Sequence, residues 1–335
     1  MYEQYYHLRE RAFNLTPDPR FLYFTERHCE ALANLVYGIR ERKGFLVLSG
    51  EVGTGKTTLI NALLDTLERA NVLSALIFNP LLSVSEFFEY VMNDFNLKAQ
   101  GRSKSQILMT LNSLLLERYR MGQVTVLIVD EAQNLSSELL EEIRLLTNLE
   151  TATEKLLQIL LVGQPELSSK LNSPNLRQLK QRISLRCSLD PLSMFETKEY
   201  INTRLEIAGL SNQQIFADAT IAEIFRSSGG IPRLINTICD NALLTGYACD
   251  AKTVGIEIIR EVCQDLEMAD GQHLVRRSPA ATVHEPAQNS LVKELTSSES
   301  KDSNPSEIRS GSDSFDLFAQ FVDKLRERKK HGENS

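Results

Sequence analysis

The residues whose types and spacing most clearly suggest chemistry form one short glycine-rich run. It fits the phosphate-loop pattern G-x-x-x-x-G-K-[ST] and reads Gly50-Glu51-Val52-Gly53-Thr54-Gly55-Lys56-Thr57. The apolar run Phe45–Leu48 precedes it and a helix-forming stretch follows, so we predict a strand, a loop and a helix. Glycines let backbone N–H groups turn onto phosphate oxygens, Lys56 places a positive charge near the β- and γ-phosphates, and the Thr57 hydroxyl suits Mg²⁺. We therefore expect residues 50–58, which include Thr58, to bind a nucleoside triphosphate.

A second motif ends in two carboxylates. Four apolar residues, Val126–Val129, lead directly into Asp130-Glu131. This pattern predicts a buried strand that delivers both acids to the carboxyl edge of a sheet, where doubly wound folds bind their ligands. Asp130 is then the expected partner of Mg²⁺, and Glu131 is the expected acceptor of a proton from an attacking water molecule.

The elements that must position these motifs alternate between short apolar runs and longer amphipathic stretches. This alternation favours an α/β fold with a parallel sheet and helices on both faces. The predicted strands are Phe45–Leu48, Leu73–Phe78, Val124–Val129, Leu156–Val162 and Ile183–Leu189. The predicted helices among them include Lys56–Arg69, Ser103–Arg120 and Ser136–Leu149, and Ser136 can cap the last of these.

Beyond Pro191 the strand pattern stops, and four amphipathic stretches predict a small α-helical lid domain. They are Thr197–Ala208, Asp218–Ser227, Pro232–Tyr247 and Val254–Glu267. A polar stretch rich in Ser, Pro, Glu and Asn then predicts a disordered C-terminal tail. The predicted parts are an N-terminal arm and first helix (1–43), a nucleotide-binding α/β domain (44–191), the lid (192–269), a linker (270–313) and an amphipathic helix (314–331).

Both ends of the chain leave alternatives open. In the arm, Pro17-Asp18-Pro19 and the aromatic residues Phe21, Tyr23 and Phe24 either cover an adenine cleft or simply pack on the core. Near the C-terminus, Ser314–Lys330 has apolar residues at helical spacing and basic residues at its end. This helix either docks on its own core, binds a partner or lies on a membrane surface.

Composition limits the binding partners and the cellular compartment that we expect. The net charge of −7 does not indicate an extended basic surface for nucleic acid. The five cysteines are scattered without a C-x-x-C pair, which indicates reduced structural thiols. The N-terminus lacks the basic and apolar regions of a signal peptide, and no apolar run approaches the ~20 residues of a membrane helix. We expect a cytoplasmic protein.

Several motifs together resemble AAA+ ATPases of the ExeA/GspA type. They lie at Phe13–Tyr23, Asp130–Leu135, Val162–Leu167 and Gly229–Asn236, and the resemblance covers residues 1–268. It implies Mg²⁺-dependent ATP hydrolysis by a homo-oligomer that serves type II secretion, MSHA-type pilus assembly or exosortase (PEP-CTERM) systems. Secretion-associated members often continue into a membrane helix and a periplasmic region. This sequence offers a polar linker there, so the pilus- or exosortase-associated type fits better, with a partner at the inner membrane.

The resemblance also implies roles for single residues. Gln164 matches the polar sensor of the γ-phosphate, and an amide can both donate and accept there. Arg233 matches the second sensor, which reports the γ-phosphate to the lid. Asn79 is placed to hold Glu131 inactive until a partner engages. Arg182 matches the arginine finger that is offered to a neighbouring subunit.

Three functions stay open from the sequence. The first is a cytoplasmic ATPase that energises or regulates assembly of an envelope secretion, pilus or polysaccharide-export system. The second is a DNA-binding AAA+ regulator of the transposition or origin-recognition type, since the fold alone does not assign function. The third is a nucleotide switch that presents a binding state through Ser314–Lys330.

Overall fold

The computed structural model describes residues 1–15, 19–21, 23–78, 81–98, 101, 103–211 and 213–267. Contacts divide the chain into Met1–His273 and Leu274–Ser335, and all described residues belong to the first unit. The predicted linker 270–313 and helix Ser314–Lys330 lie outside the described residues, as do Pro17, Asp18 and Asn79. None of the described helices is both long and apolar enough to cross a membrane.

A five-stranded sheet in the order β2-β3-β4-β1-β5 forms the centre of the α/β part of the chain. Its strands are β1 (Phe45–Gly50), β2 (Leu73–Ile77), β3 (Thr125–Val129), β4 (Leu157–Gly163) and β5 (Ile183–Leu189). Every neighbouring pair is parallel. All five predicted strands are therefore confirmed, and so is the α/β fold class with a parallel sheet.

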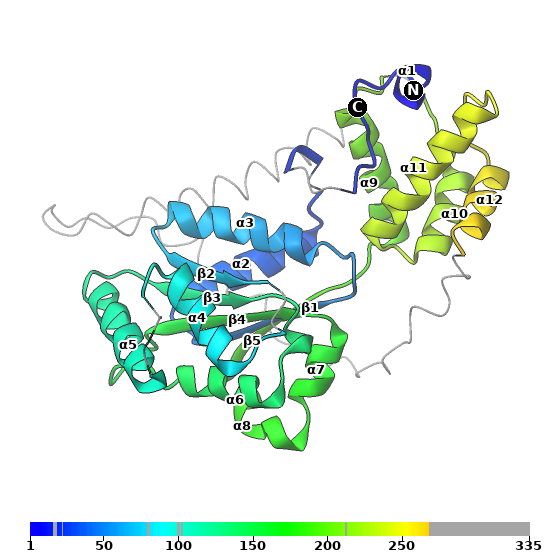
Figure 1. The fold of residues 1–335 in the computed structure, drawn as a ribbon. Helices are drawn as coiled ribbons and strands as arrows, with labels where there is room; N and C mark the ends of the chain where they lie inside the picture. Colours follow the sequence, from blue (N-terminus) through cyan, green and yellow to red (C-terminus); the bar gives the residue numbers. More distant parts are fainter. Residues whose placement is uncertain are drawn as a thin grey trace, which may run out of the picture. The chain divides into compact units, whose positions relative to one another are not determined.

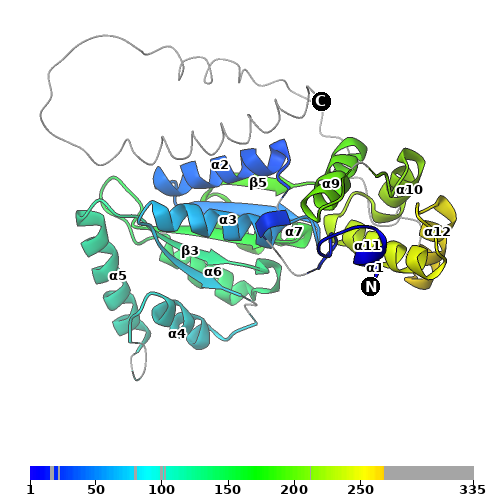
Figure 2. The same ribbon diagram turned by 90° about the horizontal axis from the view of Figure 1, so that it is seen from above.

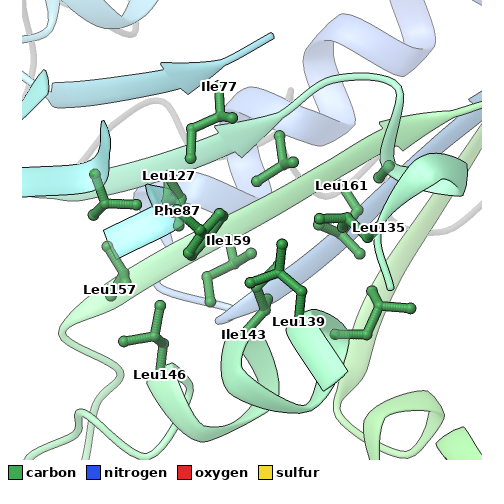
Figure 3. Packing of buried hydrophobic residues seen from close by; sticks show 14 of the residues in the cluster. Ile77, Phe87, Leu127, Leu135, Leu139, Ile143, Leu146, Leu157, Ile159 and Leu161 are labelled. Carbon is green, nitrogen blue, oxygen red and sulfur yellow. The ribbon is translucent and has the colours of Figure 1, made fainter. Parts of the chain in front are cut away.

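Alternate side chains of the strands enter two separate cores, because successive strand residues point to opposite faces. On one face, Leu46 and Leu48 pack with α2 (Glu26–Arg40) and α3 (Lys56–Arg69). The opposite face is covered by α4 (Val84–Asp94), α5 (Lys104–Arg120), α6 (Ser137–Leu146), α7 (Pro165–Leu171) and α8 (Arg177–Lys180), as Figure 1 shows. Figure 3 shows strand side chains Leu127, Leu157, Ile159 and Leu161 against Leu139, Ile143 and Leu146 of α6. Helices on both faces explain why β3 and β4 are apolar almost throughout.

Local capping sets where several helices begin. Ser136 accepts a hydrogen bond from Leu139 N at 3.0 Å, which confirms it as the cap of α6. Capping boxes start α5 at Ser103 and α4 at Ser83. The box of α4 consists of Ser83 and Glu86.

The helical lid consists of α9 (Met194–Ile207), α10 (Asp218–Ser228), α11 (Pro232–Ala248) and α12 (Ile256–Asp265), which lie together in Figure 2. The N-terminal arm, with α1 (Tyr2–Tyr5) and the 3-10 helix η1 (Pro19–Phe21), contributes to its core. The arm residues buried there are Tyr2, Tyr6, Leu8, Ala12, Phe13 and Phe21. The described part of the arm up to Tyr23 therefore packs on the lid, whereas Phe24 and α2 pack on the sheet.

A buried arginine ties the arm to the lid. Arg204 of α9 donates to the carbonyl oxygen of Ala12 at 2.7 Å and to that of Asn14 at 3.4 Å. It also donates to the Tyr200 hydroxyl at 3.0 Å, and its guanidinium carbon lies 5.0 Å from the centre of the Phe21 ring. A single buried cation thus supplies hydrogen bonds to two arm carbonyls.

We expect Arg204→Met to destabilise the protein by about 2–4 kcal/mol, because it leaves the arm carbonyls unsatisfied. Chemical denaturation measures this change, and limited proteolysis of the arm should become faster. The matched control is Arg260→Met, because Arg260 is 61% exposed and pairs with Glu223 at the surface. The control should cost less than about 1 kcal/mol. Equal effects from the two substitutions would contradict the role of Arg204.

Candidate functional site

The glycine-rich run is a loop between β1 and α3, as predicted. Gly53 has φ +83° and Gly55 has φ +98°, which is left-handed backbone that favours glycine. Lys56 begins α3, and its ammonium donates to the carbonyl oxygens of Gly50 and Glu51 at 2.8 Å each. The loop thus closes around its own lysine. It ends at the N-terminus of α3, and helix N-termini are favourable places for anions such as phosphate.

The threonines of the loop differ in their surroundings. Thr54 is buried, and its hydroxyl donates to the Glu51 carbonyl at 2.9 Å. Thr57, the expected Mg²⁺ ligand, is exposed, while Thr58 is half-buried behind it. Val52 is half-exposed at the tip of the loop. The structure therefore leaves Thr57 accessible and uses Thr54 to hold the loop together.

The acid pair lies at the carboxyl end of β3, one strand removed from β1. Asp130 is buried, its N–H donates to Ile77 O at 2.9 Å, and its Oδ1 accepts from Glu131 N at 2.8 Å. Glu131 has φ +51°, so the chain turns sharply between the two carboxylates. This turn leads into the 3-10 helix η2 (Ala132–Asn134) and separates the directions of the two acids.

Two amides contact the carboxylate of Glu131. Gln164, at the end of β4, donates from Nε2 to Glu131 Oε2 at 3.2 Å, so the structure brings the predicted sensor to the predicted proton acceptor. Gln133 also donates from Nε2 to Glu131 Oε2. The same Gln133 accepts at Oε1 from Gln164 N at 3.1 Å. Gln133 thus connects the two residues.

Sequence reasoning missed Gln133 as a single residue, although it lies within the family motif Asp130–Leu135. Its position depends on the turn at Glu131 and on close packing. A Cβ atom at Gly163 would lie 2.7 Å from Gln133 Oε1, so glycine leaves the room that the amide needs. Lys170 Nζ donates to the Gln133 carbonyl at 3.0 Å and holds the turn from the α7 side.

Arg233 lies at the start of α11, next to the phosphate loop. Its N–H donates to Gly53 O at 3.4 Å. A Cβ atom at Gly53 would lie 2.7 Å from Arg233 Cβ and 3.0 Å from Ile231 Cγ2, so only glycine permits this approach. The lid therefore reaches the loop at the residue predicted as the second sensor.

Arg182 lies away from the loop of its own subunit. It immediately precedes Ile183, which pairs with Phe45 at the amino end of β1, whereas the loop follows the carboxyl end of that strand. Its guanidinium donates to Thr147 Oγ1 at 2.6 Å. Two other arginines near Arg182 in the sequence, Arg177 and Arg186, could also serve as a finger, and both are exposed. Arg182 therefore lies at the end of β1 opposite to the loop that the same strand carries.

Comparison with known proteins identifies relatives of this chain. A family model described as an AAA domain matches residues 39–171. The General secretion pathway protein A of Aeromonas hydrophila is 45% identical over 249 residues, which are 74% of this chain and 45% of that protein. The chain belongs to the AAA+ ATPases of the ExeA/GspA type. It spans less than half of the length of this relative.

Solved structures share the AAA+ fold at low identity. The ORC2 protein of Aeropyrum pernix has a TM-score of 0.55 and 18% identity, over 76% of this chain and 71% of that one. Cdc6p of Pyrobaculum aerophilum has a TM-score of 0.57 and 16% identity, over 80% and 74%. Drosophila ORC bound to DNA has a TM-score of 0.56 and 19% identity, over 80% and 67%. At such identities the likeness shows the fold alone.

The electrostatics of the AAA+ site suit an anion and a hard cation together. Burial lowers the pKa of Lys56, and the charges of Glu131 and Asp130 act in the opposite direction. Burial raises the pKa of Asp130, against the hydrogen bond from the Glu131 N–H. A positive partner for this buried carboxylate would offset its desolvation.

The donor set fits Mg²⁺. Asp130 supplies a carboxylate oxygen and Thr57 a hydroxyl oxygen, which are the hard ligands that this ion prefers. Among the described residues, no group of three or more His, Cys, Asp or Glu side chains is suited to hold a metal alone. Mg²⁺ usually takes one or two protein ligands together with phosphate and water oxygens, and this site matches that pattern.

We expect Gln133→Ala to lower kcat for ATP hydrolysis about 10–100-fold while nucleotide affinity changes little, because the amide orients Glu131 and Gln164 rather than the phosphates. Steady-state phosphate release and equilibrium nucleotide binding measure the two quantities. Asn134→Ala is the matched control, since Asn134 is the next residue and exposed. An equal loss in the control would show a general effect on the turn.

Proposed function

We propose that this chain binds ATP with Mg²⁺ and hydrolyses it to ADP and phosphate. The observation that carries the proposal is the meeting of Lys56, Asp130 and Glu131 at one sheet edge, with Gln164 hydrogen-bonded to Glu131. Membership of the AAA+ ATPases supports nucleotide hydrolysis at the level of the family.

Binding uses groups that the loop already holds in place. The Lys56 ammonium donates to two loop carbonyls, Gly50 and Glu51, and phosphate oxygens are stronger acceptors for it because they are charged. The N-terminus of α3 adds its dipole and backbone N–H groups. We assign the nucleotide contacts to Gly50, Glu51, Val52, Gly53, Thr54, Gly55, Lys56, Thr57 and Thr58.

Hydrolysis follows from the acid pair and its amides. Thr57 and Asp130 would hold Mg²⁺, which when bound neutralises charge that develops on the phosphates. Glu131 accepts a proton from the attacking water, and Gln164 keeps the carboxylate oriented from 3.2 Å away. Since both amides contact Oε2, the other carboxylate oxygen is the one we assign to the water.

Two arginines complete the proposed site from different directions. Arg233 adds positive charge from the lid, whose first α11 residues contact the loop at Gly53. Arg182 acts as a finger on the nucleotide of a neighbouring subunit, because its own loop lies at the other end of β1. This assignment requires a homo-oligomer.

We further propose that ATP turnover energises or regulates assembly of a bacterial envelope secretion, pilus or polysaccharide-export system. The support is the 45% identity to General secretion pathway protein A. In this proposal the chain acts in the cytoplasm, peripheral to the inner membrane through a protein partner, and Ser314–Lys330 is the candidate contact. The net charge of −7 gives no support to the DNA-binding alternative.

We expect both Lys56→Ala and Glu131→Gln to reduce kcat at least about 100-fold, for different reasons. Lys56→Ala removes the charge that binds phosphate, so ATP affinity falls as well. Glu131→Gln removes only the proton acceptor, so the protein retains ATP. Phosphate release and binding of a fluorescent ATP analogue separate the two effects.

Glu138→Gln is the control for charge removal, because Glu138 is an exposed carboxylate in the first turn of α6. It should hydrolyse ATP at the parental rate. If Glu131→Gln also hydrolyses ATP at that rate, the catalytic assignment of Glu131 is wrong.

The assignment of Arg182 predicts complementation between subunits. We expect Arg182→Ala to lower kcat about 1,000-fold or more, and mixing with the Glu131→Gln protein to restore part of the activity. The reason is that Arg182→Ala subunits keep an intact loop and acid pair, while Glu131→Gln subunits still offer a finger. Phosphate release across mixing ratios and protein concentrations measures this effect.

Three control variants separate an effect on catalysis from an effect on structure. Thr147→Val removes the hydroxyl that Arg182 contacts, and it should leave kcat within about threefold if that contact is only structural support. Arg177→Ala and Arg186→Ala test the neighbouring cations. A mixture no more active than the sum of its parts, at every concentration, would exclude a finger at Arg182.

A further inference from the structure

A histidine lies buried beneath the phosphate loop and has no role in the chemistry described above. His28 is in the first turn of α2, and both it and the N-cap residue Thr25 are only 6% exposed. His28 Nε2 lies 3.1 Å from the carbonyl oxygen of Thr54, inside the loop. A Cβ atom at Gly55 would lie 3.2 Å from the same nitrogen, so the imidazole is against the backbone of the loop.

The hydrogen bonds define which nitrogen carries the proton. A carbonyl oxygen only accepts, so His28 Nε2 donates to Thr54 O. Thr25 Oγ1 lies 2.7 Å from Nδ1 and also accepts from His28 N at 3.3 Å, so its hydroxyl proton is directed to Nδ1. The neutral Nε2–H tautomer satisfies every one of these groups.

Burial favours this neutral form. It lowers the pKa of His28 below its usual 6.5, while the bond to Thr54 and the charge of Glu196 act in the opposite direction. Glu196 belongs to α9 of the lid, and the ammonium of Lys56 on the loop is held by carbonyl oxygens. Tyr23 is neutral as well, because burial raises its pKa to about 12.

The bond to Thr54 has a consequence for phosphate binding. In a trans peptide, the C=O of one residue and the N–H of the next point in opposite directions. Holding the Thr54 carbonyl toward α2 therefore directs the Gly55 N–H away from α2. That N–H belongs to the loop that we assign to the phosphates.

The residues before His28 connect this contact to the lid. The Tyr23 ring lies 5.9 Å from that of Tyr200 on α9, in an edge-to-face arrangement. The Phe24 ring lies 6.0 Å from the imidazole. The short segment from Tyr23 to His28 therefore contacts the lid helix α9 at one end and the loop at the other.

We propose that His28 is a positioning residue for nucleotide binding, which fixes the Thr54–Gly55 peptide so that the Gly55 N–H meets a phosphate oxygen. Thr25 sets the tautomer that makes this possible. The inference rests on the proposed binding of ATP by this loop. It adds a contact from α2 that controls the affinity of the loop for phosphate.

The test measures the Kd of a fluorescent ATP analogue for the full chain, with and without Mg²⁺, at pH 8. His28→Phe keeps the ring but loses the donor, and we expect about tenfold weaker binding, which corresponds to one hydrogen bond. His28→Gln keeps an N–H donor at a similar reach and should bind within about threefold of the parent. Thr25→Val should weaken binding less than His28→Phe.

A pH series tests whether the Nε2–H donor or the charge of His28 acts on the loop. Protonation of the imidazole adds a proton at Nδ1 and leaves the Nε2–H that donates to Thr54, and the lowered pKa of His28 moves this step to more acidic pH. Nucleotide phosphates titrate too, so the measured quantity is the Kd of the parent divided by that of His28→Gln at each pH. We expect this ratio to stay within about threefold from pH 8 to below pH 6, because both proteins keep an N–H donor to Thr54.

Lys56→Ala and His7→Gln complete the set of variants. His7 is exposed and should leave Kd and its pH dependence unchanged when replaced. If His28→Phe binds as tightly as the parent, or if the ratio changes strongly with pH, His28 does not position the loop through its Nε2–H donor. If Lys56→Ala also binds normally, the proposed nucleotide site itself is wrong, and the two failures are thereby distinguished.

Discussion

The site depends on the parallel pairing of β3, β4 and β1. Val129 lies opposite Leu161 in one pair of strands, and Ser49 lies opposite Gly163 in the next. The acid pair, Gln164 and the phosphate loop therefore leave the sheet at the same edge. This register is strongly specified because both faces of the strands are buried, and a slip by one residue would exchange the two cores.

The polar groups at this edge of the sheet need hydrogen-bond partners, and the turns that follow the strands supply them. The Asp130 carboxylate accepts a hydrogen bond from the Glu131 N–H, and the Lys56 ammonium donates to two loop carbonyls. The Glu131 carboxylate accepts from two side-chain amides. A buried polar group without a partner would cost about 1–3 kcal/mol. Gln133 therefore supports the acid pair as Gln164 does, because it donates to the Glu131 carboxylate and accepts from the Gln164 N–H.

The parts predicted from sequence are those that local pattern controls. Apolar runs predicted all five strands. The resemblance to the ExeA/GspA type implied that Gln164 and Arg233 are sensors of the γ-phosphate, and in the structure Gln164 contacts Glu131 and Arg233 contacts the loop. The position of Gln133 depends instead on the left-handed turn at Glu131 and on the space above Gly163. Packing of the arm on the lid depends on contacts such as Arg204 to Ala12, which join residues far apart in the sequence and leave no local periodicity.

The loop is contacted from two sides by elements outside the sheet. His28 holds Thr54 from α2, and Ile231 and Arg233 approach Gly53 from α11. A nucleotide can shift the lid only to the extent that it binds one lid position better than another. The contacts at Thr54 and at Gly53 are where the affinity for a nucleotide can come to depend on the position of the lid. The reason is that a phosphate bound in the loop would use N–H groups of the same backbone. The arm packs with the lid, and Tyr23 contacts Tyr200, so the residues just before α2 connect the lid to the His28 contact beneath the loop.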